Sequence, residues 1–155
     1  MAKTAADIMD TDVPALGTQD EARRAIELLA EREIGALPVV NSEQRLIGIV
    51  SESDLVLSDE KADLHLPHYF NIMGGIVFTG SMKGFEDRLN KAFATKVRDL
   101  MTADPVSVRT DDGVEKAARL IAEKHHNHIP VTDGDGKVAG MITRADVLAA
   151  LVDEE

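Results

Sequence analysis

Apolar and polar residues follow a pattern that occurs twice along the chain. In residues 20–32 the apolar positions Ala22, Ala25, Ile26 and Leu29 recur at helical spacing, which predicts an amphipathic helix. Two short β-branched runs follow this stretch, and the polar turn between them predicts a β-hairpin. A short extended piece precedes the helix and a further helix follows the hairpin. The pattern therefore predicts a βαββα unit, present in two copies.

The predicted elements have matching positions in the two copies. In the first copy they are a short helix or turn at 7–9, an extended segment at 13–16, a helix at 20–32, strands at 37–40 and 46–50, and a helix from Ser51. In the second copy they are a short helix or turn at 99–101, an extended segment at 105–108, a helix at 112–124, strands at 129–132 and 138–142, and a helix from Thr143. Thr18 with Glu21 predicts a capping box at the start of the first amphipathic helix.

A constant interval of 92 residues separates the two copies, without a gap from about residue 5 to residue 57. It joins Asp7 to Asp99, Pro38 to Pro130, Gly48 to Gly140, and Asp54 to Asp146. One unit of about 55 residues buries too little surface to be stable alone. We therefore expect a pseudo-twofold pair, sheet against sheet, with ligand-sized clefts between the copies. We place the first unit at 1–58, an inserted segment at 59–95 and the second unit at 96–155.

The inserted segment holds all four Phe residues and the only Tyr. In residues 81–94 the apolar side chains of Met82, Phe85, Leu89 and Phe93 form one stripe at helical spacing, which predicts a helix. Such aromatic residues must be buried against something. A homodimer contact is our first expectation, and packing within the chain or against a partner protein remains open.

Charge and composition exclude several classes of function. The formal net charge is −11, with 28 acidic and 17 basic residues and no basic patch, so we do not expect nucleic-acid binding. The absence of cysteine excludes disulfides and thiolate metal sites. No apolar run approaches the ~18 residues of a membrane helix and no signal-peptide pattern is present, so we expect a cytoplasmic protein.

Two motifs resemble the core of a CBS domain. The first is Gly-Ala-Leu-Pro-Val-Val at 35–40 followed by Gly-Ile-Val-Ser-Glu-Ser-Asp at 48–54, and the second is its counterpart at 128–132 and 140–146. Two such units in tandem form a CBS pair, or Bateman module. The resemblance implies an α/β (α+β) fold of two βαββα units in a pseudo-twofold pair. It also implies a regulatory module that binds an adenosine nucleotide and has no catalytic activity.

The resemblance also implies where the ligand binds. The Asp of the motif accepts hydrogen bonds from the ribose hydroxyls, the Ser or Thr contacts ribose or phosphate, and apolar residues near the second strand enclose adenine. One cleft would use Thr143, Asp146, Met141, Asn127 and His128, closed by Pro14, Ile34, Gly35 and Ala36. The other would use Ser51, Asp54, Ile49, Gly35 and Ala36, closed by Val106, His126 and Asn127. Both Ser/Thr–Asp pairs also fit a helix cap, and the two roles can coexist.

The two clefts differ in charge. Arg144 follows Thr143 and His128 lies nearby, whereas Glu52 occupies the position of Arg144 in the first copy. We therefore expect the Asp146 cleft to be the stronger site for a phosphorylated ligand. AMP, ADP, ATP, S-adenosylmethionine and a dinucleotide all remain open as ligands, and we expect no resident cofactor.

Other functions remain as alternatives. The module could be a dimerising scaffold whose clefts stay empty. His125, His126 and His128 suggest a metal-dependent hydrolase, although a helix C-terminus also favours histidine through its dipole. A regulatory module without an effector domain acts on a separate protein, or is part of a longer chain such as a transporter or an enzyme.

Overall fold

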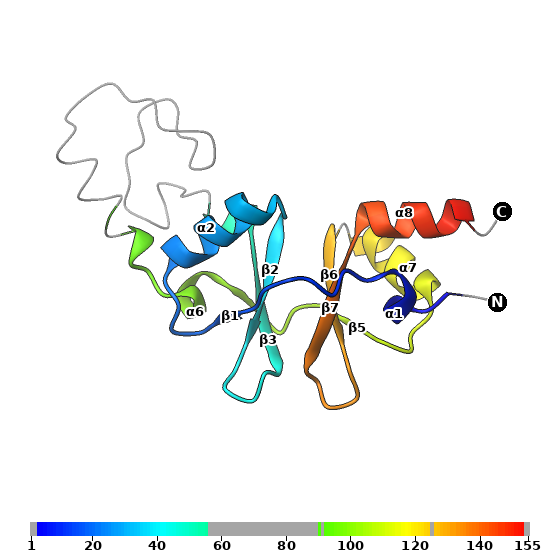
Figure 1. The fold of residues 1–155 in the computed structure, drawn as a ribbon, viewed down its shortest axis with the longest axis horizontal. Coiled ribbons are helices and arrows are strands. Elements are labelled where there is room, and N and C mark those ends of the chain that lie inside the picture. Colours follow the sequence, from blue (N-terminus) through cyan, green and yellow to red (C-terminus); the bar gives the residue numbers. More distant parts are fainter. Residues whose placement is uncertain (1–2, 56–89, 91, 125, 154–155) are drawn as a thin grey trace, which may run out of the picture.

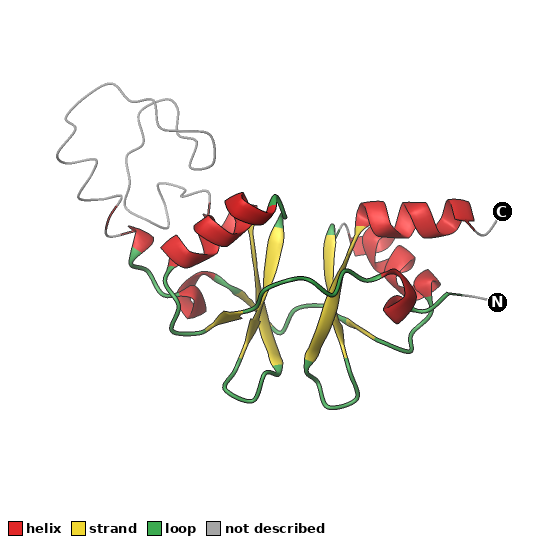
Figure 2. Cartoon of the chain, in the orientation of Figure 1, coloured by secondary structure: helices red, strands yellow, loops and turns green. Residues whose placement is uncertain are grey.

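Two β-sheets lie side by side in the middle of the molecule, with the longer helices on their outer sides (Figures 1 and 2). The structure is a computed structural model that describes residues 3–55, 90, 92–124 and 126–153. It confirms the predicted α/β fold of two related units. Most of the inserted segment, including Tyr69, Phe70, Phe78, Phe85 and the predicted helix before Asn90, lies outside the described residues.

The elements pack into two units, the first half and the second half, each around its own core. The first half consists of β1 (Leu16–Gly17), α2 (Ala22–Arg32), β2 (Ala36–Val40), β3 (Leu46–Ser51), α3 (Glu52–Leu55), α6 (Val97–Leu100) and β4 (Thr102–Ala103). The second half consists of α1 (Ala5–Ile8), β5 (Val108–Arg109), α7 (Val114–Lys124), β6 (His128–Thr132), β7 (Val138–Thr143) and α8 (Arg144–Asp153). Helices α2 and α7 and the two hairpins arise where the sequence pattern predicts them.

Strand pairing is the same in the two sheets. A short parallel strand, β1 or β5, lies beside the first strand of a hairpin, and the hairpin strands are antiparallel. The register pairs Leu37 with Val50 in the first sheet and Ile129 with Ile142 in the second. All four side chains are fully buried, and β2, which is buried at every position, is covered on both faces.

Each hairpin turn is closed by backbone hydrogen bonds and by a side chain that adds to them. Asn41 Oδ1 accepts the N–H groups of residues 43 and 45, and Asp133 Oδ1 accepts those of residues 135 and 137. Short amide and carboxylate side chains favour this local turn geometry. The turns of the two hairpins meet, because the Leu46 N–H donates to the Gly136 carbonyl at 3.0 Å.

Each half has its own aliphatic core. The core of the first half contains Leu16, Leu29, Leu37, Val39 and Val50, and that of the second contains Val108, Ile121, Ile129, Val131 and Ile142. The low aromatic content of 3% is consistent with this packing. Burial of these side chains supplies the main stabilising free energy of both halves.

The short helices α1 and α6 are exchanged between the sequence repeats. Helix α1 comes from the first repeat, yet Ala5 is fully buried in the core of the second half. Helix α6 comes from the second repeat, and Val97 is fully buried in the core of the first half. After α6, strand β4 pairs with β3, so each half is completed by a segment of the other repeat. Both chain ends consequently lie at the end of the molecule formed by the second half (Figure 1).

The predicted capping box of α2 is wrong. The helix begins at Ala22, its N-cap is Glu21, and no side chain caps it. The Ala22 N–H donates to the Thr95 carbonyl at 2.8 Å, so a backbone group at the end of the inserted segment occupies the place of a local cap. The carboxylate of Asp20 instead accepts the Gly17 N–H at 2.8 Å and closes the turn before the helix.

The inserted segment contributes one described aromatic side chain. Phe93 lies beside α2, with the guanidinium carbon of Arg23 4.7 Å from the ring centroid, a favourable cation–π distance. Phe93 therefore packs within the chain, which is one of the alternatives that the sequence leaves open for the aromatic residues of the inserted segment. None of the helices among the described residues has the length and apolarity needed to cross a membrane.

Candidate functional site

The two strand-to-helix junctions share one contact, in which the Asp carboxylate accepts the backbone N–H of the residue three positions earlier. At the first junction, Asp54 Oδ2 accepts the Ser51 N–H at 2.9 Å and the Ser51 hydroxyl at 3.1 Å. At the second, Asp146 Oδ2 accepts the Thr143 N–H at 2.9 Å, and the Thr143 hydroxyl accepts the Asp146 N–H at 3.2 Å. Both contacts of the predicted capping box are present at the second junction, whereas at the first the Ser51 hydroxyl donates to the Asp54 carboxylate instead of accepting the Asp54 N–H.

Capping occupies only one oxygen of each carboxylate. Within the described part of the chain, the hydrogen bonds that the carboxylates of Asp54 and Asp146 accept all go to Oδ2. Both residues are half-buried at the start of a helix, where its dipole favours a negative charge. Oδ1 of each residue is therefore left to accept hydrogen bonds from a ligand.

A cavity of about 510 Å³ lies beside the first junction, between residues of both repeats. All eight residues that the sequence assigns to this cleft line it: Gly35, Ala36, Ile49, Ser51, Asp54, Val106, His126 and Asn127. Its volume is within the range of small-molecule sites, about 300–1,000 Å³. The structure thus brings together, in one hollow, two groups of these eight residues that are more than 50 positions apart in sequence.

Six further residues line this cavity. The sequence also points to Glu52 and His128, although it predicts His128 in the other cleft. Sequence reasoning misses Ser53, Thr102, Asp104 and Pro105. The last three enter the site because β4 pairs with β3, with Thr102 opposite Ile49. In the sequence these residues follow Met101, which the interval of 92 residues relates to Met9. That position does not show that their segment pairs with β3, because only the tertiary fold determines the pairing.

The residues that the sequence assigns to the second cleft are spread over both repeats, and four of them, Gly35, Ala36, Asn127 and His128, line the first cavity. Met141 is buried in β7, and its backbone exchanges two hydrogen bonds with Asp10, at 2.8 and 3.0 Å. Arg144 is exposed at the start of α8, and its N–H donates to the Asn127 carbonyl at 3.2 Å. Pro14 is half-buried between α1 and β1, and Ile34 is half-buried after α2 against the first half's core.

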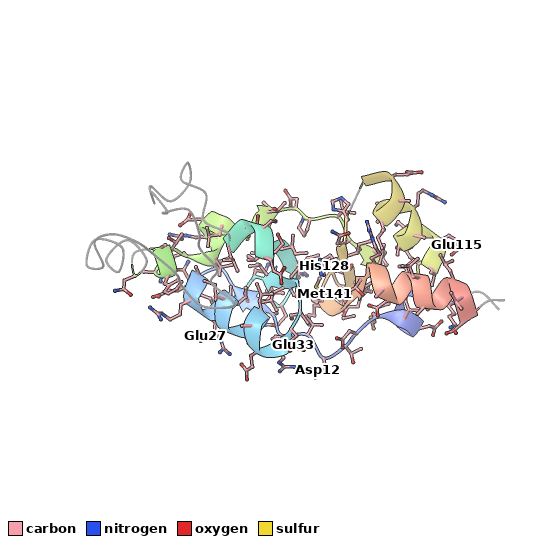
Figure 3. The ribbon with its side chains drawn as sticks, turned by 90° about the horizontal axis from the view of Figure 1, so that it is seen from above. Asp12, Glu27, Glu33, Glu115, His128 and Met141 are labelled. Carbon is pink, nitrogen blue, oxygen red and sulfur yellow. The ribbon has the colours of Figure 1, made fainter. Side chains whose placement is uncertain are left out.

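His128 joins the two halves at the middle of the molecule (Figure 3). A Cβ atom on Gly35 would lie 2.6 Å from both Cε1 and Nε2 of the ring, so only glycine leaves room for this imidazole. Burial lowers the pKa of His128, and the negative charge of Glu52 opposes this by raising it. The ring is therefore neutral at neutral pH. It lines the cavity and lies against Gly35 of the first repeat.

Acidic pH should destabilise the protein through His128. Because its pKa is lower in the folded protein than the usual 6.5, the unfolded chain binds the proton more readily. The free energy of unfolding should fall as the pH drops below about 6.5, with a slope below the single-group limit of about 1.4 kcal/mol per pH unit, since the ring is partly exposed. Urea denaturation at several pH values, for the protein and for His128→Gln, measures this. An identical pH dependence in the variant would contradict the assignment.

The histidines do not assemble with carboxylates into a metal site within the described residues. No group of three His, Asp or Glu side chains there could hold a metal ion. His65, His68 and His125 lie outside the described part of the chain.

Comparison with known proteins identifies the fold family. The model of the CBS domain family matches residues 5–60 and 97–153. Protein MJ1426 of Methanocaldococcus jannaschii, uncharacterized, is 33% identical over 132 residues, which cover 82% of this chain and 79% of that protein. The chloroplastic CBS domain-containing protein CBSX2 of Arabidopsis thaliana is 34% identical over 127 residues, and the match spans 53% of its length.

The solved structures agree. The crystal structure of CBSX2 in complex with AMP superposes with a TM-score of 0.72 and 30% sequence identity, over 97% of both chains. A second structure of CBSX2 superposes with a TM-score of 0.73 and 28% identity. The family model thus matches this chain twice. The chain therefore belongs to the CBS domain family, and its two CBS domains form a CBS pair, or Bateman module.

Proposed function

We propose that this CBS pair is a regulatory module that binds an adenine nucleotide or a related adenosyl ligand between its two repeats. The observation that carries the proposal is the cavity of about 510 Å³, lined from both repeats by the residues that the motif assigns to ligand binding. The AMP complex of CBSX2, 30% identical over 97% of the chain, supports adenine nucleotides as the ligand class.

The junction carboxylates provide the ribose contacts in this proposal. Oδ2 of Asp54 and of Asp146 caps a helix, and Oδ1 accepts hydrogen bonds from ribose hydroxyls. The apolar side chains of Ile49 and Val106 face the first cavity, and each comes from a different repeat. An aromatic base between them is held by both repeats at once.

Signalling follows from this shared construction. A ligand that contacts both repeats favours the relative orientation in which both sets of contacts are made, and so shifts the population of conformations. The protein transmits that shift to a partner protein or to an effector fused to it. Its own part of this mechanism is binding, and no bond of the ligand is made or broken.

The Asp146 junction is the proposed site for the phosphorylated ligand. Arg144 begins α8 beside Thr143 and is exposed, so its guanidinium is free to form a bidentate contact with a phosphate. The N-terminus of α8, a helix of ten residues, adds a favourable dipole.

Thermal unfolding with and without ligand tests the proposal. At a hundredfold its dissociation constant, AMP, ADP, ATP or S-adenosylmethionine should stabilise the protein by about 2.7 kcal/mol. Asp146→Ala should abolish the shift for the phosphorylated compound that binds. Asp112→Ala is the matched control, because the Asp112 carboxylate also accepts a backbone N–H, from Arg109 at 2.7 Å. Asp112 lies just before the N-terminus of α7 and does not belong to either junction.

The outcomes separate the alternatives. A shift that persists in Asp146→Ala and is unchanged in Asp112→Ala would contradict the assigned ribose contact. No shift with any compound would reject nucleotide binding in favour of a homodimeric scaffold. For that scaffold, the exposed side chains of Leu148, Leu151 and Val152 on α8, 57%, 45% and 69% exposed, are the candidate contact surface. Metal found in the purified protein, with hydrolase activity lost on chelation, would support the enzymatic alternative.

A further inference from the structure

We propose that the cavity beside Ser51 and Asp54 selects an adenosyl ligand whose 5′ substituent is neutral or cationic, and that Glu52 and Asp104 determine this selectivity. The inference rests on the proposed function, since it specifies which adenosyl compounds this cavity accepts. The two junctions would then bind ligands of different charge, although the two repeats have the same pattern of elements and align at a constant interval of 92 residues.

The described residues that line the cavity make it acidic. Glu52, Asp54 and Asp104 each contribute a carboxylate, whereas none of the described lining residues is Lys or Arg. The imidazole of His128 adds no positive charge at neutral pH, because burial lowers its pKa. A ligand with two or three phosphates would find no permanent cation to pair with among the described residues that line this space.

The size of the cavity keeps a bound phosphate near the carboxylates. A cube of 510 Å³ has an edge of about 8 Å, close to the screening length of about 8 Å at physiological ionic strength. A phosphate inside therefore lies no more than about two screening lengths from each carboxylate, so its charge is not fully screened from theirs. Like charges at this distance in a partly enclosed site oppose binding, whereas a neutral or cationic group is not opposed.

Asp104 is held in place by the backbone. Its φ is +48°, in the left-handed region, and its N–H donates to the Ile47 carbonyl at 3.2 Å. Asn adopts this conformation as readily as Asp. Asp104→Asn therefore removes the charge and keeps the loop, which makes it a suitable test.

The counterpart positions at the second junction carry different charges. The interval of 92 residues places Arg144 at the position of Glu52 and Asp12 at the position of Asp104. Asp12 forms an ion pair with Arg32, with Nη1 to Oδ2 at 3.2 Å. The second junction thus has one cation where the first has a carboxylate, and its other carboxylate is paired.

Titration calorimetry in an Asp146→Ala background isolates the first cavity. The ligands are adenosine, S-adenosylmethionine, AMP and ATP, without divalent cations, at low and at moderate salt. Adenosine and S-adenosylmethionine should bind about tenfold more tightly than ATP at low salt, and added salt should reduce this ratio. The double variant Glu52→Gln/Asp104→Asn should reduce it at least about fivefold.

A matched control and two outcomes complete the test. Glu27→Gln removes one exposed carboxylate from α2, away from His128 in Figure 3, and should leave the ratio unchanged. ATP binding as tightly as adenosine, with no effect of the double variant, would overturn this inference and leave the proposed function standing. Failure of all four compounds to bind, both in this background and in the unmodified protein, would overturn the proposed function itself.

Discussion

Deletion of residues 1–10 is expected to destabilise the second half of the molecule, although these residues precede the first half in sequence. Five backbone hydrogen bonds join residues 3–10 to the rest of the second half. They are Ala5 N to Asp112 O, Ala6 N to Thr110 O, Val114 N to Lys3 O, and the pair between Asp10 and Met141. At about 1 kcal/mol each, their loss costs about 5 kcal/mol, before the buried side chain of Ala5 is counted. This approaches the whole stability of a small domain.

Hydrogen exchange measures this effect within one molecule. Amides of β6 and β7 should lose protection in the deleted protein, whereas those of β2 and β3 should keep most of theirs, because the first half is completed by α6 instead. Equal protection of β6 and β7 in the deleted and full chains would show that the exchanged helix does not support the second half.

Gly140→Ala should lower the free energy of unfolding by about 3 kcal/mol, which combines overpacking with loss of a backbone contact. A Cβ atom at this position would lie 2.6 Å from the Asp10 carbonyl oxygen and 2.9 Å from Met9 Sδ. The carbonyl belongs to the bridge with Met141 and cannot rotate away, so the segment before β1 has to move. Chemical denaturation of the variant measures the loss.

Two other glycines provide controls for this substitution. At Gly48, the counterpart, the nearest atom to an added Cβ is Met101 Sδ, the end of a flexible side chain, so Gly48→Ala should cost less. At Gly134 the nearest atom is Arg109 Nη2 at 3.9 Å, and Gly134→Ala should change stability by no more than about 0.5 kcal/mol. Equal effects at 140 and 134 would show that the close approach at Gly140 is unimportant.

The exchanged segments also connect the fold to the site. Strand β4 brings Thr102 beside Ile49 and places Asp104 on the cavity wall, so the first cavity depends on a segment of the second repeat. In the same way Asp10 is bound to Met141 next to the second junction. A ligand at either place therefore contacts chain segments that run directly into the other repeat, which is the physical basis for the proposed signalling.

Much of the fold could be predicted because its signals are local. Helices α2 and α7 follow from apolar periodicity, the hairpins from β-branched runs around Asn41 and Asp133, and the caps from Ser51–Asp54 and Thr143–Asp146. In each of these features the interacting groups are at most four residues apart or share one face of an element. The constant interval of 92 residues then implies that both copies repeat the same local structure.

The sequence by itself thus determined the elements, the pairing of two repeats and eight residues around the first cavity. Only the tertiary structure decided that α1 and α6 are exchanged, that Thr95 rather than Thr18 satisfies the start of α2, and that Asp104 faces the cavity. The physical reason is that a strand as short as β4 carries no local information about its partner. Its pairing is chosen by the burial of Val97 and by backbone hydrogen bonds between segments more than 50 residues apart, which no local pattern encodes.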